Sequence, residues 1–126
     1  MVAIISSPID VASLLQGFSD PLTGGTTVFM GTVRNHSQGK PVRYLEYTAY
    51  TPMAEKLMKE IEQEIRSKWE VQHVVMVHRL GVLSIGEIAV VTAVSCAHRN
   101  EAFEACRYAI DRVKEVVPIW KREEWG

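Results

Sequence analysis

A helical repeat of apolar residues in the middle of this chain constrains its fold more than any other feature. Charged residues fill the opposite face of the same segment, so the segment reads as an amphipathic helix. Its start is well marked, because Thr51 can cap the helix and Pro52 suits the first helical position. The apolar face needs a surface that covers it, and the rest of the chain must supply that surface. The repeating apolar residues are Met53, Leu57, Met58, Ile61, Ile65 and Trp69.

Segments with strand character flank this helix on both sides and can supply that surface. They lie at residues 2–6, 26–34, 42–50, 73–81 and 88–96. The segments 26–34 and 42–50 are expected to form a long hairpin, with NHSQGKP as its loop. The segment 88–96 (IAVVTAVSC) is apolar enough to lie inside the sheet, and VLSIGE is the predicted turn before it. Asp10 can cap a short helix that ends near Leu15.

A second long helix is predicted from Glu101 to about Val116, where Pro118 ends it. Residues 119–121 then continue as an extended segment. The order of strands, helix, strands, helix and strand predicts an α+β fold with helices packed on a mainly antiparallel sheet. No repeat, linker or low-complexity tract interrupts the chain, so one domain over residues 1–126 is expected.

The composition excludes several classes of protein. A formal net charge of −1 gives no reason to expect bulk attraction to nucleic acid or to a membrane surface. No apolar run approaches the roughly 20 residues that a membrane helix needs. The first residues, MVAIISSPIDV, show neither a secretory signal nor a transit peptide, so the chain is expected to act in the cytoplasm. Cys96 and Cys106 are expected to be two buried thiols rather than a disulfide.

Two lysines lie on either side of Pro118. At 100° per residue, Lys114 falls beside Phe103 and Ile110, on one flank of the apolar stripe of the second helix. Such a lysine can act as a nucleophile or as a proton carrier, or it can simply extend its amine into water while its stem covers apolar surface. Lys121 follows the break, in the segment PIWK.

Two further clusters of basic residues lie at the ends of predicted elements, one at the start of the second helix and one at the end of the strand 26–34. His98 and Arg99 lie at the start of the second helix, where free amides and the helix dipole favour an anion such as a phosphate or carboxylate. A capping histidine with a surface arginine would give the same sequence. Arg34, with Asn35 and His36, lies at the end of the strand 26–34. Local sequence does not establish that these clusters meet.

Other kinds of site have weaker support. Cys96 and His98 could form a thiol nucleophile with its base, although Cys96 follows the apolar run VVTAVS and suits an inert buried thiol better. The four histidines form no compact ligand motif, so no metal is predicted. No glycine-rich dinucleotide or triphosphate motif is present, and no cofactor is predicted.

Five blocks in order along the chain carry a resemblance to a known family. They are FMGTVRNHSQG, LEYTAYTPMA, VHRLGVLSIGE, SCAHRNEAFEA and DRVKEVVPIWKRE. Together they closely resemble the catalytic (large) subunit of molybdopterin synthase, the MoaE family, from about Phe29 to Glu123. Five ordered blocks are far more specific than any single motif.

The resemblance implies an α/β hammerhead fold that forms one large-subunit-like domain. It implies a homodimer within a heterotetramer, in which a small ubiquitin-like sulfur-carrier subunit of the MoaD type docks at each end. The small subunit carries a C-terminal thiocarboxylate. Its sulfur is transferred to cyclic pyranopterin monophosphate, once to each of two carbons, and the product is the dithiolene of molybdopterin.

The family's functional residues fall on matching positions of this chain. Lys114 would meet the thiocarboxylate, while Lys121, on a strand anchored by Ile119 and Trp120, would bind or polarise the pterin. The basic residues that would hold the phosphate include two from the other protomer of the dimer, His98 and Arg99. The implied substrate-binding residues are Arg34, His98, Arg99, Phe29 and Ile110.

Three other functions stay open from the residues alone. The chain could be a binding module for a small phosphorylated ligand, a scaffold that only docks a ubiquitin-like protein, or a thiol enzyme centred on Cys96 and His98. One departure from the family also matters. Many members continue past the WKRE block with a short tail that would help cover the pocket or brace the partner, whereas this sequence ends at REEWG.

Overall fold

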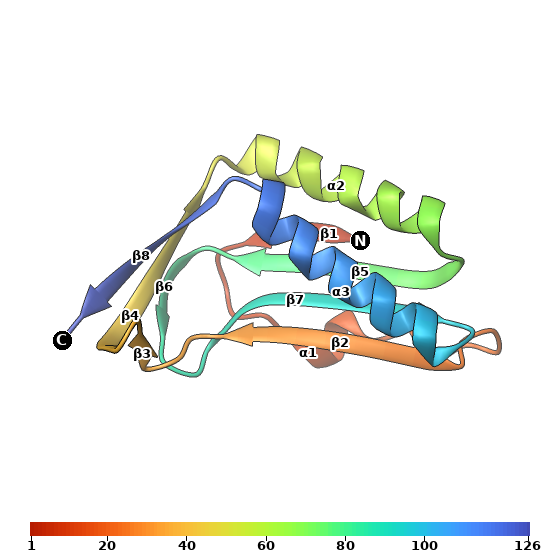
Figure 1. Cartoon of the computed structure of the whole chain (residues 1–126), viewed down its shortest axis with the longest axis horizontal. Helices are drawn as coiled ribbons and strands as arrows, with labels where there is room; N and C mark the ends of the chain where they lie inside the picture. Colours follow the sequence, from red (N-terminus) through yellow and green to blue (C-terminus); the bar gives the residue numbers. More distant parts are fainter.

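The computed structural model describes residues 1–126 as two sheets with two long helices over one of them (Figure 1). The elements in chain order are β1 (Val2–Ile5), α1 (Val11–Leu14), β2 (Gly25–Thr32), β3 (His36–Ser37), β4 (Lys40–Ala49), α2 (Thr51–Lys68), β5 (Val71–Arg79), β6 (Gly81–Ser84), β7 (Ile88–Cys96), α3 (Arg99–Val116) and β8 (Ile119–Trp125). The predicted α+β class, with helices on a mainly antiparallel sheet, is confirmed.

The first sheet has the strand order β1-β5-β7-β2. Only β1 and β5 are parallel, and the other neighbours are antiparallel. Strand β7 lies between two partners and is covered on both faces, which explains why its sequence is apolar without alternation. Successive residues of β7 face opposite cores: Val94 packs under the long helices, and Ala93 packs against the segment around α1. The predicted interior position of this strand is confirmed.

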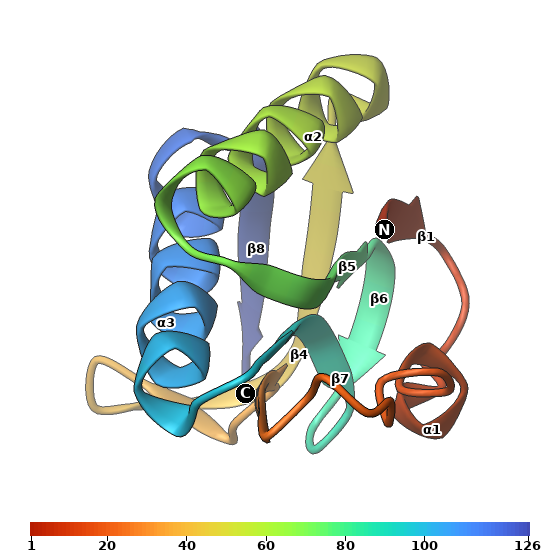
Figure 2. The same cartoon turned by 90° about the vertical axis from the view of Figure 1, so that its right-hand side faces the viewer.

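Helices α2 and α3 cover one face of the first sheet, as the two views show (Figures 1 and 2). The buried face of α2 is rotated from the predicted stripe by about one position. Met58, Ile61 and Ile65 are buried as predicted, but Ala54 is buried too and Met53 is 41% exposed. A tight approach to α3 explains the rotation, because small residues of α3 such as Ala102, Ala105 and Ala109 lie in the same cluster.

The start of α2 corrects the predicted cap. The N-cap residue is Tyr50 and makes no side-chain capping bond, while Thr51 is already helical. Pro52 still occupies an early helical position, where its missing N–H costs nothing. The predicted cap of α1 is confirmed, because the Asp10 carboxylate accepts a hydrogen bond from the Ser13 backbone N–H at 3.2 Å.

The second sheet corrects two predictions. Its core strand is β4, which pairs with β3, β6 and β8 and does not pair with β2, so the long hairpin was wrong. Strand β2 instead pairs along its length with β7, which needs a neighbour on each side to stay buried. The predicted loop holds the short strand β3 and a tight turn in which Gln38 and Gly39 both have positive φ. The predicted turn VLSIGE also holds a strand, β6.

The chain leaves α3 at Pro118 and returns as β8 beside β4. This strand is longer than the predicted 119–121 segment. Ile119 packs against the main core, so it does anchor the strand, but Trp120 is 58% exposed and does not. No helix of the chain has both the length and the apolar character needed to cross a membrane.

Candidate functional site: a basic cavity where the two sheets meet

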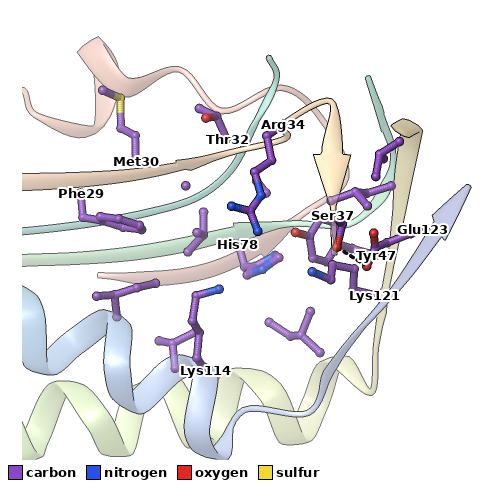
Figure 3. Close-up of a pocket in the computed structure, with 18 of the residues that line it drawn as sticks. Phe29, Met30, Thr32, Arg34, Ser37, Tyr47, His78, Lys114, Lys121 and Glu123 are labelled. Atoms are coloured by element: carbon purple, nitrogen blue, oxygen red, sulfur yellow. Dashed lines mark hydrogen bonds between the residues drawn. The ribbon is translucent and has the colours of Figure 1, made fainter. Parts of the chain in front are cut away.

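A cavity of about 630 Å³ opens where the first sheet, the end of α3 and the second sheet come together (Figure 3). Its walls come from β2, β5 and β7 on one side and from β3, β4 and β8 on the other. Two core clusters support these walls separately: the main core lies under the long helices, and a smaller cluster lies within the second sheet. Residues that are far apart in sequence therefore line the same cavity.

Five of the seven predicted site residues line this cavity. They are Phe29, Arg34, Ile110, Lys114 and Lys121. Ile110 is buried at 9% exposure, although its neighbour on the predicted flank, Phe103, is 57% exposed. The structure thus brings together the two lysines that lie on either side of Pro118, together with the arginine after β2.

The break in the chain at Pro118 explains how both lysines reach one space. Lys114 lies in the last turn of α3, and its side chain points from the helix toward His78 and Arg34 (Figure 3). Lys121 lies on β8 directly opposite Tyr47 of β4. A helix that continued through residue 121 would carry the second lysine away from the second sheet, so ending α3 early is what makes the pair converge.

A single carboxylate faces the three cations of the cavity. Glu123 accepts hydrogen bonds from Ser37 Oγ at 3.2 Å and from Trp125 Nε1 at 3.3 Å. The hydrogen bond from Trp125 is the largest cause that lowers the pKa of the Glu123 carboxyl, and the bond from Ser37 is the next. The charges of Lys121 and Arg34 act in the same direction. Three cations against one carboxylate leave the cavity positive, although the chain as a whole carries a formal charge of −1.

His98 and Arg99 lie at the opposite end of α3 from Lys114. His98 is the N-cap residue and Arg99 is the first helical residue, and both are exposed. Fifteen residues of helix separate Arg99 from Lys114, which is about 22 Å along the axis. Within one chain these two residues therefore do not join the cavity. They line a separate surface recess with Gly24, where a side chain would collide with the Ala97 carbonyl.

The cavity also contains residues that the sequence did not single out as a site. His78, Tyr47 and Glu123 line it, together with Ser37 and Met30. Burial, and secondarily the Glu123 charge, raise the pKa of Tyr47, so the phenol keeps its proton. His78 had a detectable signal: it is a histidine at a helix-facing position of a strand whose neighbouring residues are apolar.

The two thiols lie in the core. Cys96 and Cys106 are free and are each 1% exposed, which confirms the prediction of buried thiols. Burial raises the pKa of both thiols, opposite to the shift that a reactive cysteine needs. His98 is exposed at the helix start, so the structure gives no support to a thiol enzyme built on Cys96.

The cavity suits chemistry on an anion. Lysine and arginine side chains can hold a phosphate or a carboxylate, and they can stabilise negative charge that develops during acyl transfer. The apolar part of the lining, from Phe29 to Ile110 and Val113, can accept a flat ring. A small anionic heterocycle and an acyl group would fit this combination of surfaces.

Comparisons with known proteins identify relatives of this chain. A family model described as MoaE protein matches residues 4–116. A protein of Halalkalibacterium halodurans named molybdopterin synthase catalytic subunit is 46% identical over 123 residues, which cover 98% of this chain and 79% of that protein.

Solved structures agree with these sequence matches. The crystal structure of molybdopterin synthase from Staphylococcus aureus is similar with a TM-score of 0.92 at 45% identity, over 98% of this chain and 90% of that one. A complex of subunits 1 and 2 of the molybdopterin-converting factor from Helicobacter pylori matches with a TM-score of 0.80, over 97% and 83% of the two chains. That second match is 23% identical and supports the fold alone.

Proposed function

Because the chain belongs to the MoaE protein family, we propose that it is the catalytic subunit of a molybdopterin synthase. The observation that carries the proposal is the convergence of Lys114 and Lys121 with Arg34 in one cavity. These three cations come from α3, from β8 and from the loop after β2, and only the folded chain brings them together.

In this proposal the cavity receives two ligands. One is the C-terminal thiocarboxylate of a small ubiquitin-like subunit of the MoaD type, and the other is cyclic pyranopterin monophosphate. Lys114 meets the thiocarboxylate and Lys121 polarises the pterin, while Arg34 binds the phosphate. Phe29 and Ile110 form apolar walls for the ring. The cations stabilise the charge that develops as the sulfur moves from the acyl carbon to the pterin, which makes the chain a sulfurtransferase.

We further propose that His98 and Arg99 complete the site of a second copy of the chain. Both are exposed at a helix N-terminus, which favours an anion, and both lie about 22–24 Å along the helix from Lys114 of their own chain. A two-fold dimer can bring the start of one α3 to the cavity of the partner. With one small subunit for each large one, the assembly is a heterotetramer. It would work in the cytoplasm, where buried thiols such as Cys96 and Cys106 stay reduced.

Reconstitution tests the reaction directly. The purified chain, mixed with a thiocarboxylated small subunit and cyclic pyranopterin monophosphate, is expected to form the molybdopterin dithiolene in an amount limited by the thiocarboxylate supplied. The matched control is the same mixture with a small subunit that ends in an ordinary carboxylate, which should give no product. A folded chain that binds both ligands but forms no dithiolene would instead support the alternative, a binding module for a phosphorylated ligand or a ubiquitin-like partner.

A mixed dimer tests whether the site is shared between protomers. Lys114→Ala and Arg99→Ala are each expected to be nearly inactive alone, but an equal mixture that has exchanged subunits should regain about a quarter of the wild-type activity. Half of the dimers are then mixed, and one of the two sites in each has both wild-type residues. Activity is assayed before and after exchange through mild denaturant. No gain after verified exchange would contradict the shared site.

A further inference from the structure

His78 is the one histidine buried in this chain, at 7% exposure, and it lines the cavity. It follows Val74 and Met76 on the face of β5 that packs under α2 and α3. Its partners across the sheet are Ile4 and Val90, which are apolar. An imidazole thus occupies a position where the pattern of the strand calls for an apolar side chain, at the point where the core opens into the cavity.

The imidazole ring is held in one orientation and one tautomer. Its Nδ1 lies 2.9 Å from the Arg79 carbonyl oxygen. A carbonyl oxygen only accepts, so Nδ1 carries the hydrogen and donates it. The ring of Tyr47 packs edge-on against the imidazole, with 4.9 Å between centroids and 68° between planes. In the neutral ring, the lone pair therefore lies on Nε2.

The Nε2 atom opens into the cavity. It has no hydrogen-bond partner within the chain. The side-chain nitrogen and oxygen atoms that are both buried from solvent and without a hydrogen-bond partner are Arg79 Nε, Ser95 Oγ and Glu101 Oε2. Nε2 of His78 is not among them. Because Nε2 has no hydrogen-bond partner and is not buried from solvent, a water molecule or ligand can reach it from the cavity that His78 lines. Figure 3 shows the ring between Lys114, Arg34 and Lys121.

The surroundings keep this histidine neutral. Burial is the main cause that lowers the pKa of His78, and the charge of Lys114 lowers it further. The hydrogen bond to the Arg79 carbonyl raises the pKa but does not outweigh burial. The other titratable or charged groups that line the cavity are Arg34, His36, Tyr47, Lys121 and Glu123. Most of the charges are positive and disfavour an imidazolium. At neutral pH the ring is therefore a free base facing the reacting groups.

The proposed reaction needs such a base. A thiocarboxylate that gives up its sulfur leaves an acyl carbon that must gain an oxygen, and water balances the reaction. The thiocarboxylate sulfur first attacks a pterin carbon and takes the place of the oxygen on that carbon, which leaves with its electron pair as water or as the phosphate oxygen. The sulfur stays attached to the acyl carbon in this step. Water then adds to the acyl carbon, the C–S bond breaks with its electron pair on sulfur, and the small subunit ends in a carboxylate. The attacking water loses a proton in this step.

We propose that Nε2 of His78 takes that proton. This role rests on the proposed sulfurtransferase function. Lys114 and Lys121 are ammonium groups that stabilise the anions, whereas the neutral imidazole supplies the proton acceptor that ammonium groups lack. Carbon–sulfur bond formation does not need the base, so His78 acts on release of the sulfur from the small subunit and not on its attachment to the pterin.

Single-turnover kinetics with wild type, His78→Gln and His78→Asn test this role. Glutamine and asparagine keep a polar amide but cannot take a proton. Both variants are expected to release product about 10²-fold more slowly or worse. They should accumulate the small subunit joined through sulfur to the pterin, detected by intact mass, and added imidazole should partly restore release. The control is His73→Gln, which changes a histidine on the same strand that pairs with Asp20 outside the cavity and should release product at the wild-type rate.

The wild-type pH profile gives a test that needs no variant. Release should slow as the pH falls through the lowered pKa of His78, below the ordinary value of about 6.5, because protonation removes the lone pair. A release rate that stays flat from about pH 8 down to the pH at which the protein unfolds would overturn the role of His78. So would a folded His78→Gln that releases product like wild type. Absence of both the joined species and the product in wild type would instead overturn the proposed function itself.

Discussion

Replacing Lys114 with alanine is expected to lower kcat for dithiolene formation by about 10²–10³-fold, the effect of removing one preorganised stabiliser of an anion. Lys114 projects from the last turn of α3 into a cavity whose other cations come from different elements, so no neighbour on the same helix can replace its charge. The measurement is the rate of product formation with saturating small subunit and pterin precursor. Binding of the small subunit is measured in parallel, by calorimetry.

Two further variants make the result specific. Lys114→Arg keeps the charge but spreads it over a planar group, so activity between that of wild type and that of the alanine variant is expected. Lys59→Ala removes an exposed lysine from the outer face of α2 and should leave activity and stability unchanged. Wild-type turnover by a folded Lys114→Ala would contradict the assignment of this residue to the reaction.

The second large effect concerns the packing of α2. Met58→Ala is expected to lower the free energy of unfolding by about 2–5 kcal/mol, because it leaves a cavity beneath a fully buried side chain. Met53→Ala makes the same chemical change five residues earlier in the same helix, where the side chain is 41% exposed, and should cost well under half as much. Urea unfolding gives both values when the slope with denaturant stays constant.

The two methionine variants test which face of α2 is buried, the face seen in the structure or the stripe predicted from the sequence. Both belong to the apolar repeat that predicts α2, but only Met58 lies in the main core cluster. Equal losses for the two variants would mean that the helix is rotated relative to the structure described here. A urea midpoint that falls clearly for Met58→Ala alone would fit a domain whose total stability is about 5–15 kcal/mol, because the expected loss is a large part of that total.

Local periodicity was enough to predict the helices and most strands. The repeat that ends near Trp69 and the apolar run of β7 are set by each segment's own contacts with the core, so sequence reasoning found them. Strand pairing was not predictable in the same way. Strand β2 pairs with β7, which lies more than 50 residues later in the chain and is buried only when it has a neighbouring strand on each side.

The residues of the site likewise fall into those that the sequence predicted and those that only the folded chain shows. The resemblance pointed to Phe29, Arg34, Ile110, Lys114 and Lys121, and the structure brings these five residues together. His98 and Arg99 stay a prediction for the dimer, because one chain does not bring them to the cavity. His78 was missed as a site residue because its one local signal, a histidine among the apolar residues of a strand, does not by itself indicate a cavity. Its significance depends on α3 ending beside it and on Tyr47 arriving from the second sheet.

Helix α3 carries one group of proposed site residues at its start and another at its end, and this has a genetic consequence. If each dimer shares its sites as proposed, an allele that loses Lys114 and an allele that loses Arg99 would complement each other in the same cell. A single allele that loses both would behave in the opposite way. Expressed in equal amount with a wild-type copy, it would inactivate both sites of every mixed dimer, one through each end of the helix. About a quarter of the sites would stay active, which is half of what an allele with one of the two losses would leave.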